Sequence, residues 1–133
     1  MRKIHVRVDF ERALQEGRKM PALRNGDRLL VIEPRLYKDD NTRMFVGIVE
    51  DYDQSTIRLR GFPFHLNPYE ISGSERHGEE RVRLLSLSAG YIIYLLPEDL
   101  DVSKLMLRRS PKSLMLTEGD NMSLDLSEWL TRT

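Results

Sequence analysis

The chain has 133 residues, with 21 basic and 21 acidic side chains and a formal net charge of zero. This length suits one domain with a modest core, and the balanced charge supplies no general attraction for nucleic acid, so any such binding has to be local. The absence of cysteine excludes disulfides, thiol nucleophiles and thiolate metal ligands. The N-terminus lacks the apolar core of a signal peptide, and the longest apolar run, residues 89–96, is too short to cross a bilayer. We therefore expect a soluble, cytoplasmic protein that does not associate with membranes.

Residues 1–27 are predicted to hold a short strand and a short helix. Residues 3–8 alternate polar and apolar side chains, which is the period of a strand. Residues 9–17 follow with an apolar helical face, an Asp at the N-cap position and a Gly at the end. The Asn-Gly-Asp sequence at 25–27 indicates a turn, and residues 29–32 form an apolar strand after it.

Residues 43–59 give the most informative pattern, which is a bent hairpin with a tight turn. Gly47 lies where a strongly curved strand has no room for a side chain. Asp53 begins a polar turn and can accept hydrogen bonds from the backbone just after it. Ile57 and Leu59 then alternate with polar residues, as expected for a strand with one buried face.

The second half of the chain contains a loop and further strands. Residues 72–80 are polar and glycine-containing, so we predict one long exposed loop. Residues 81–88 read as a strand, Gly90 interrupts it, and residues 91–96 read as another strand before Pro97.

Residues 98–133 are predicted to be an extension beyond this core. Residues 104–107 and 113–116 suit the two arms of a hairpin that turns at residues 110–112. A short helix is predicted around residues 124–130.

The hairpin resembles the first Sm motif of the Sm and LSm proteins, and especially of their bacterial relative Hfq. That motif contains an Arg, an aromatic residue, a Gly and an aliphatic residue, then an aromatic-Asp pair, a short turn and a strand with alternating aliphatic residues. The matching residues are Arg43, Phe45, Gly47, Val49, Tyr52, Asp53, Ile57 and Leu59. Gln54 also matches the Phe-Asp-Gln order of Hfq, and residues 88–95 resemble the second Sm motif, with Ala89 in place of its basic residue. An unrelated small barrel is the alternative.

The resemblance covers residues 28–97 and implies a mainly β fold within a single domain, residues 1–133. The implied architecture is an Sm-like, strongly bent, five-stranded antiparallel barrel, with a short helix in the N-terminal part, residues 1–27. Residues 98–133 form the C-terminal extension.

The resemblance also implies a homo-oligomeric ring, from pentamer to heptamer, in which the fourth strand of one copy pairs with the fifth strand of the next. The residues themselves support an assembly, because the strand at 91–96 has apolar side chains on both faces. The interface would use Arg83, Leu85, Leu87, Tyr91, Ile92, Ile93, Tyr94 and Leu95. The alternative is a monomer in which the C-terminal hairpin covers the second face.

Single-stranded RNA is the partner that the resemblance implies, since the family holds bases at two loops of the ring pore. Transferred to this chain, the binding residues are Asp53, Gln54, Ser55, Thr56, Gly90 and Tyr91. Ser55 lies where a stacking aromatic residue is expected, and Ala89 lies where a cation is expected, so the pocket is degraded. A second basic surface is one interpretation of four strand arginines, and solvated strand-face charges are the alternative that we favour. It would consist of Arg58, Arg60, Arg81 and Arg83.

The sequence does not indicate an enzyme. Its three histidines, at positions 5, 65 and 77, have no metal-ligand spacing and are expected to be exposed. The acidic pairs lie in turns or at strand ends, where nothing buries one member for acid–base catalysis. We expect no cofactor and no metal. The first interpretation is a ring protein that binds, chaperones or processes RNA, and the alternative is a structural or scaffolding ring without a nucleic-acid role.

Overall fold

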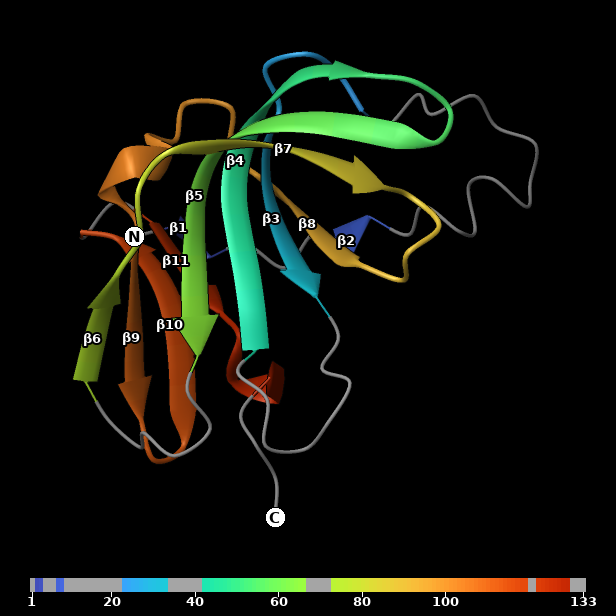
Figure 1. The fold of residues 1–133 in the computed structure, drawn as a ribbon. Helices are drawn as coiled ribbons and strands as arrows, with labels where there is room; N and C mark the ends of the chain where they lie inside the picture. The colour runs from blue at the N-terminus through green and yellow to red at the C-terminus, as the bar shows by residue number, and fades with distance from the viewer. Residues whose placement is uncertain are drawn as a thin grey trace.

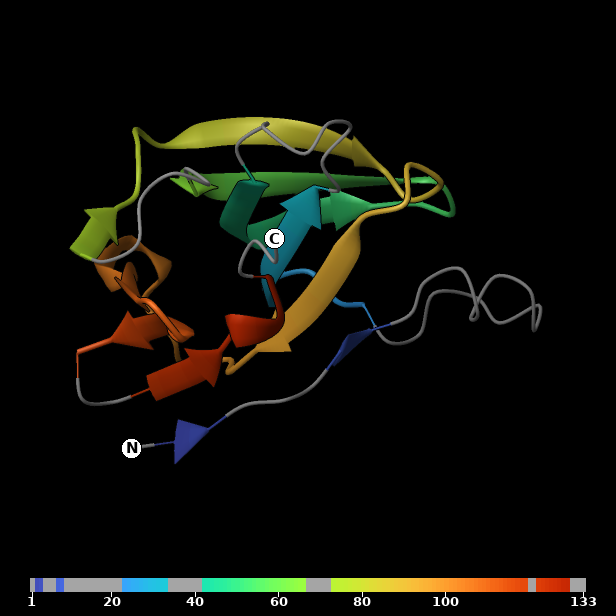
Figure 2. The same ribbon diagram turned by 90° about the horizontal axis from the view of Figure 1, so that it is seen from below.

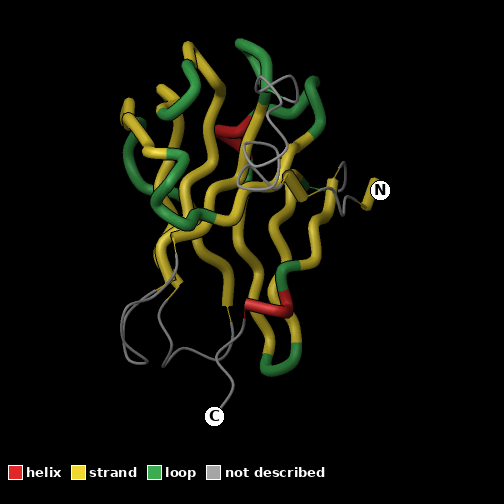
Figure 3. The backbone as a smooth tube through the Cα atoms, turned by 90° about the vertical axis from the view of Figure 1, so that its right-hand side faces the viewer, coloured by secondary structure: helices red, strands yellow, loops and turns green. Residues whose placement is uncertain are grey.

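The computed structural model describes residues 2–3, 7–8, 23–33, 42–66, 73–119 and 122–129. The regular structure in these segments is almost entirely β-strand (Figure 3). The helices among them are two short 3-10 turns, η1 (Val102–Lys104) and η2 (Ser127–Trp129). Neither is long or apolar enough to cross a membrane. The helix predicted at residues 9–17 lies outside the described segments.

The strands form two sheets (Figure 1). The larger sheet has the order β2-β8-β3-β4-β5-β7, and all its neighbouring strands are antiparallel. The smaller sheet has the order β1-β11-β10-β9-β6, with a parallel β1–β11 pair and antiparallel pairs elsewhere. The larger sheet consists of β2 (Arg7–Val8), β3 (Arg28–Glu33), β4 (Thr42–Tyr52), β5 (Thr56–Leu66), β7 (Arg81–Ser86) and β8 (Ile92–Leu96). The smaller sheet consists of β1 (Arg2–Lys3), β6 (Gly73–Arg76), β9 (Met106–Ser110), β10 (Ser113–Glu118) and β11 (Met122–Asp125).

The prediction of a mainly β, antiparallel fold is confirmed, but the described strands form two open sheets and not one closed barrel. The larger sheet ends at β2 and at β7, because β8 pairs with β2 on its outer side and β7 pairs with β5 alone. The predicted turn at residues 25–27 and the hairpin that turns at Pro111 and Lys112 are both present.

The β4–β5 hairpin changes direction halfway along its length (Figure 1). At this point Gly47 and Gly61 face each other in the ladder. A Cβ on Gly61 would lie 1.8 Å from the Val46 carbonyl oxygen, and a Cβ on Gly47 would lie 2.9 Å from the Arg60 carbonyl oxygen. The two strands therefore approach more closely than side chains allow. The curvature predicted at Gly47 is confirmed, whereas its partner at Gly61 was not predicted.

Two clusters of buried side chains lie on opposite faces of the bent sheet. The smaller sheet lies against one side of the larger sheet (Figure 2). The first cluster is built almost entirely by the larger sheet, and the second contains residues of both sheets. The first cluster contains Leu23, Leu29, Val31, Phe45, Val49, Ile57, Leu59, Leu85, Leu87 and Ile93. The second cluster contains Leu30, Ile32, Met44, Val46, Phe64, Leu66, Tyr94 and Leu96 from the larger sheet, and nine residues from Leu100 to Leu126.

Strand β8 has buried side chains on both faces, as predicted. Ile93 belongs to the first cluster, and Leu95 packs against it. Tyr94 and Leu96 belong to the second cluster, where the C-terminal strands cover them. The monomer alternative therefore accounts for this strand, and its two apolar faces no longer argue for a ring.

Two predicted elements were wrong. Residues 73–76 form β6 inside the predicted loop, where they pair with β9. The strand is polar and largely exposed, so hydrophobic alternation did not indicate it. Residues 122–125 form β11, where a helix was predicted from residue 124, because Leu124 pairs with Leu116 in the smaller sheet and both side chains are buried. In the described residues after β11, the helical structure is the 3-10 turn η2.

His77 was predicted to be exposed, but it is partly buried and connects three parts of the fold. Its ring lies against Phe62, with 4.1 Å between the ring centroids, and edge-on to Phe64. Its two ring nitrogens lie 2.7 Å from the carbonyl oxygen of Gly78 and 2.6 Å from that of Ser103. The segment before β7 is thus held against both β5 and η1.

Replacing Gly61 with Ala tests the bend. We expect a loss of about 3 kcal/mol or more of unfolding free energy, because the new methyl group would overlap the Val46 carbonyl and push the strands apart. Gly119→Ala is the control, since a Cβ there meets nothing within 4 Å and faces only the cost of a φ of +50°. Chemical denaturation measures both variants, and a smaller loss for Gly61→Ala than for Gly119→Ala would contradict the proposed contact.

Candidate nucleic-acid interface

The turn between β4 and β5 is organised by Asp53. Its carboxylate oxygen Oδ1 accepts hydrogen bonds from the backbone nitrogens of Ser55 and Thr56, both at 2.8 Å. The backbone nitrogen of Asp53 donates to the Thr56 carbonyl oxygen at 3.0 Å, which closes the turn. The predicted role of Asp53 as turn organiser agrees with this geometry.

The same hydrogen bonds hold the carboxyl group of Asp53 in its charged form. The backbone N–H groups of Ser55 and Thr56 lower the pKa of Asp53 below its ordinary value of 3.8, and the Ser55 hydroxyl contributes in the same direction. The turn therefore carries a negative charge at neutral pH.

A second turn lies directly beside the first. The backbone nitrogen of Leu87 donates to the Ser55 carbonyl oxygen at 2.8 Å, and Thr56 is the ladder partner of Ser86. After Leu87 the chain turns through Ala89, whose nitrogen donates to the Ser86 carbonyl oxygen at 3.3 Å. The connection from β7 to β8 thus meets the tip of the β4–β5 hairpin.

Four hydroxyl groups gather where these turns meet, and we call them the hydroxyl rim: Ser55, Thr56, Ser86 and Ser88. The Ser55 and Thr56 hydroxyls are 3.4 Å apart, and those of Ser86 and Ser88 are 3.0 Å apart. Gln54 and Gly90 are exposed next to the rim, and Gly90 has a φ of +79° that favours glycine. The rim offers neutral donors and acceptors. The sequence analysis did not select Ser86 or Ser88 as binding residues, although Ser88 begins the segment that resembles the second Sm motif.

Tyr91 lies differently from the other predicted binding residues. It is partly buried and packs against the first cluster. Burial raises the pKa of Tyr91, the nearby Glu33 carboxylate raises it further, and Arg83 opposes them. Its hydroxyl therefore stays protonated at neutral pH. Although Tyr91 follows Gly90 in the chain, its ring packs against the first cluster.

A shallow groove of about 180 Å³ runs beside the Asp53 turn. It combines two carboxylates, an arginine, a tyrosine and an apolar side chain. Its lining residues are Asp51, Tyr52, Asp53, Thr56, Arg58 and Leu84. Leu84 comes from the neighbouring strand β7, and its place here depends on the β5–β7 register, with Leu84 opposite Arg58. The groove has an apolar wall and a cationic group, although two carboxylates offset the charge of Arg58.

The four arginines proposed as a basic surface do not share a face. Arg60 is bound to Glu50 at 2.9 Å and to Glu80 at 3.5 Å. The guanidinium of Arg83 lies on the opposite face of the sheet, 4.9 Å from the centre of the Phe45 ring. The geometry agrees with the alternative interpretation, in which these are solvated or paired strand-face charges.

Strand β7 is an edge strand with an apolar exposed face. Val82 and Leu84 are 46% and 65% exposed, and they are the exposed large hydrophobic residues of the described segments. Half of the predicted interface residues are instead buried within the chain, namely Leu85, Leu87, Ile93 and Tyr94. Any contact at this edge would therefore use Val82 and Leu84, which sequence reasoning did not select.

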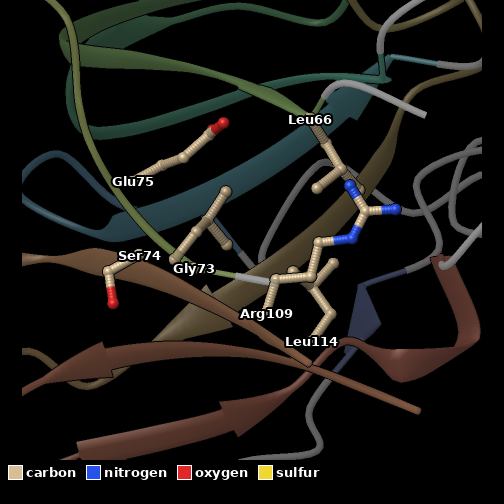
Figure 4. Close-up of a pocket in the computed structure, with 7 residues that line it drawn as sticks. Leu66, Gly73, Ser74, Glu75, Arg109 and Leu114 are labelled. Atoms are coloured by element: carbon tan, nitrogen blue, oxygen red, sulfur yellow. The ribbon is translucent and has the colours of Figure 1, made fainter. Parts of the chain in front are cut away.

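A second hollow lies between β6 and the β9–β10 hairpin (Figure 4). Its volume is about 50 Å³, and its lining includes Leu66, Glu75 and Arg109. In Figure 4 the Arg109 guanidinium extends toward Leu66. This space suits one or two water molecules and is too small for a nucleobase.

The comparisons with known proteins give no relative, since no family model, curated protein or solved structure matches the chain. In the segments that the structure describes, no group of three or more His, Cys, Asp or Glu side chains is placed to hold a metal ion.

Replacing Asp53 with Asn tests the charge of the turn. The folded-state pKa of Asp53 is lowered, so its charge stabilises the fold above the unfolded-state pKa near 3.8, and this contribution disappears as the pH falls through the lower folded value. The variant should be less stable than the wild type at pH 7, and the difference should vanish in strong acid. Denaturation across this pH range measures it, with Asp51→Asn as control. A difference that does not depend on pH would contradict the role of the charge.

Proposed function

We propose that this chain is an Sm-like protein that assembles into a homo-oligomeric ring and binds single-stranded RNA at the hydroxyl rim. The observation that carries the proposal is the hydrogen bond between Leu87 and Ser55, which joins the β4–β5 turn to the β7–β8 connection. By the resemblance described above, these are the two loops that hold bases in Sm proteins. The strand order β8-β3-β4-β5-β7 supports the same proposal. Strands β7 and β8 correspond to the fourth and fifth strands of the Sm-like region, and they lie at opposite ends of this order, so they do not pair with each other within one chain.

The chemistry of the rim favours weak binding by each subunit. Hydroxyl and backbone groups can hydrogen-bond to sugars and bases, but the turn carries Ser55 in place of a stacking aromatic residue and Ala89 in place of a cation. Each missing base–aromatic stack removes about 1–3 kcal/mol of binding free energy. Repetition of the rim around a ring supplies avidity, so the assembled form binds RNA more tightly than the lone chain does.

The edge of β7 supports the assembly. Among the described strands, none pairs with its outward-facing backbone groups, and Val82 and Leu84 expose apolar surface beside them. A strand from a second copy satisfies the backbone groups and covers the apolar side chains at the same time. This support is independent of strand β8, whose faces the chain covers itself.

The second candidate is a scaffolding ring without a nucleic-acid role. The formal net charge of zero and the pairing of Arg60 with Glu50 and Glu80 favour it, since phosphate binding depends on unpaired cations. Both candidates share the assembly and differ only in RNA binding. The first experiment below therefore separates them, and the second tests the assembly that both require.

Fluorescence anisotropy with U-rich and A-rich single strands at low salt tests RNA binding. We expect saturable binding that weakens as salt rises. A Ser55→Glu, Ser88→Glu variant should bind at least about tenfold more weakly, because it adds negative charge to the rim. Ser74→Glu on the remote strand β6 is the control and should bind as the wild type does. Absence of saturable binding by the wild type would favour the scaffolding ring.

Light scattering after gel filtration tests the assembly. The wild type should elute with the mass of a multimer, whereas Leu84→Lys should shift it toward a single subunit, because a charge would be buried against the added strand. Ser74→Lys is the control, since it places the same charge on an exposed edge strand of the other sheet. If the wild type and Leu84→Lys both remain single subunits at every concentration, the ring proposal is wrong.

A further inference from the structure

The outer edge of β8 is occupied by the chain itself. Strand β2 pairs with it antiparallel, with Arg7 opposite Tyr94 and Val8 opposite Ile93 (Figure 2). On its other side β8 pairs with β3 over five residues, from Ile92 to Leu96. Strand β8 therefore has a partner strand on each side, whereas β7 pairs with one of the described strands, β5.

This arrangement conflicts with ring closure as proposed above. In the ring, β7 of one copy adds to the outer edge of β8 in the next copy. Strand β2 lies at this same edge, and one backbone group cannot complete two ladders at once. Ring closure therefore requires β2 to leave.

We infer that strand β2 is a built-in competitor of assembly, which holds the outer edge of β8 in the lone chain and exchanges for β7 of a neighbouring copy in the ring. This inference rests on the proposed ring. It assigns the N-terminal strand a regulatory role that the resemblance to Sm proteins does not supply.

The lengths of the two strands determine which one occupies the edge. Strand β2 pairs over two residues, whereas β7 offers six residues and the apolar side chains of Val82 and Leu84. The shorter strand has the advantage of its covalent tether, which gives it an effective concentration on the order of millimolar. The tethered strand therefore prevails in dilute solution, and the longer intermolecular pairing prevails as the protein concentration rises.

The C-terminal extension helps to hold the competitor in place. Strand β1 pairs in parallel with β11, with Arg2 opposite Met122 and Lys3 opposite Ser123. The N-terminal segment is thus attached to the smaller sheet at β1 and to the larger sheet at β2. Releasing β1 lowers the effective concentration of β2 at β8, so the extension influences assembly without touching the ring contact.

A full-length Arg7→Pro, Val8→Pro variant tests the inference, because proline has no N–H to donate to the ladder. We expect the protein concentration at the midpoint of assembly, measured by sedimentation, to fall about tenfold, the effect of losing one or two ladder bonds. Arg7→Ala, Val8→Ala retains the backbone N–H groups and serves as the matched control, with a midpoint close to that of the wild type.

A second variant tests the inference by fixing β2 to β8, which should prevent assembly. Val8→Cys, Ile93→Cys places two thiols at opposed ladder positions in a chain that has no other cysteine. The oxidised form should remain a single subunit at concentrations where the reduced form assembles. Comparing the two forms of one protein removes any effect of the substitutions on folding.

The outcomes separate the competitor from the ring. One outcome is that the wild type assembles, the two prolines leave its midpoint concentration unchanged, and the oxidised cysteine variant also assembles. In that case the inference about β2 is wrong, and the proposed ring is retained. If neither the wild type nor the proline variant assembles at any concentration, the proposed ring itself is wrong, and the competitor with it.

Discussion

The close approach of β4 and β5 at the opposed residues Gly47 and Gly61 is the constraint on which the rest of the structure depends. Because neither residue has a Cβ, β4 and β5 can bend sharply while they keep their ladder. In the part of β4 that precedes Gly47, Phe45 and Val46 belong to opposite clusters, so the sheet is buried on both sides there. Between the glycine pair and the tip of the hairpin, the buried residues Val49, Ile57 and Leu59 belong to the first cluster, whereas Arg58 and Leu84 on the other face are exposed. The bend thus divides one hairpin into a part that builds the core and a part that forms the candidate site.

The C-terminal extension and the edge of β7 follow from this division. The smaller sheet covers the second cluster at the base of the hairpin, which removes the need for a partner on that face. It does not bury the exposed side chains of β7, which stays an edge strand. The rim of Ser55 and Ser86 lies at the same end of the molecule as this edge. The proposed assembly contact and the proposed binding site therefore lie at neighbouring features, and both depend on the register of β7 against β5.

Short sequence patterns correctly predicted the turns and strands that depend on neighbouring residues alone. The turn residues around Gly26 and Asp53 and the alternation of Ile57 and Leu59 indicated the turns and strands that the structure contains. Long-range pairing was not predictable in this way. Strand β6 is polar and forms only because β9 lies beside it, and the choice between Leu84 and Leu85 as the exposed residue depends on which of them faces Ile57 across the ladder. An apolar run such as Leu84-Leu85 does not reveal its own register.

Amide hydrogen exchange along β7 tests most directly the proposal that copies of the chain join at the edge of this strand. The amides of residues 81–86 that point away from β5 have no partner among the strands that the structure describes, whereas those that point toward β5 belong to the ladder. If copies join at this edge, the outward amides become protected as the protein concentration rises, and protection appears together with the increase in mass. If the outward amides exchange rapidly at every concentration, this edge is not a contact between copies, and the account of assembly is wrong.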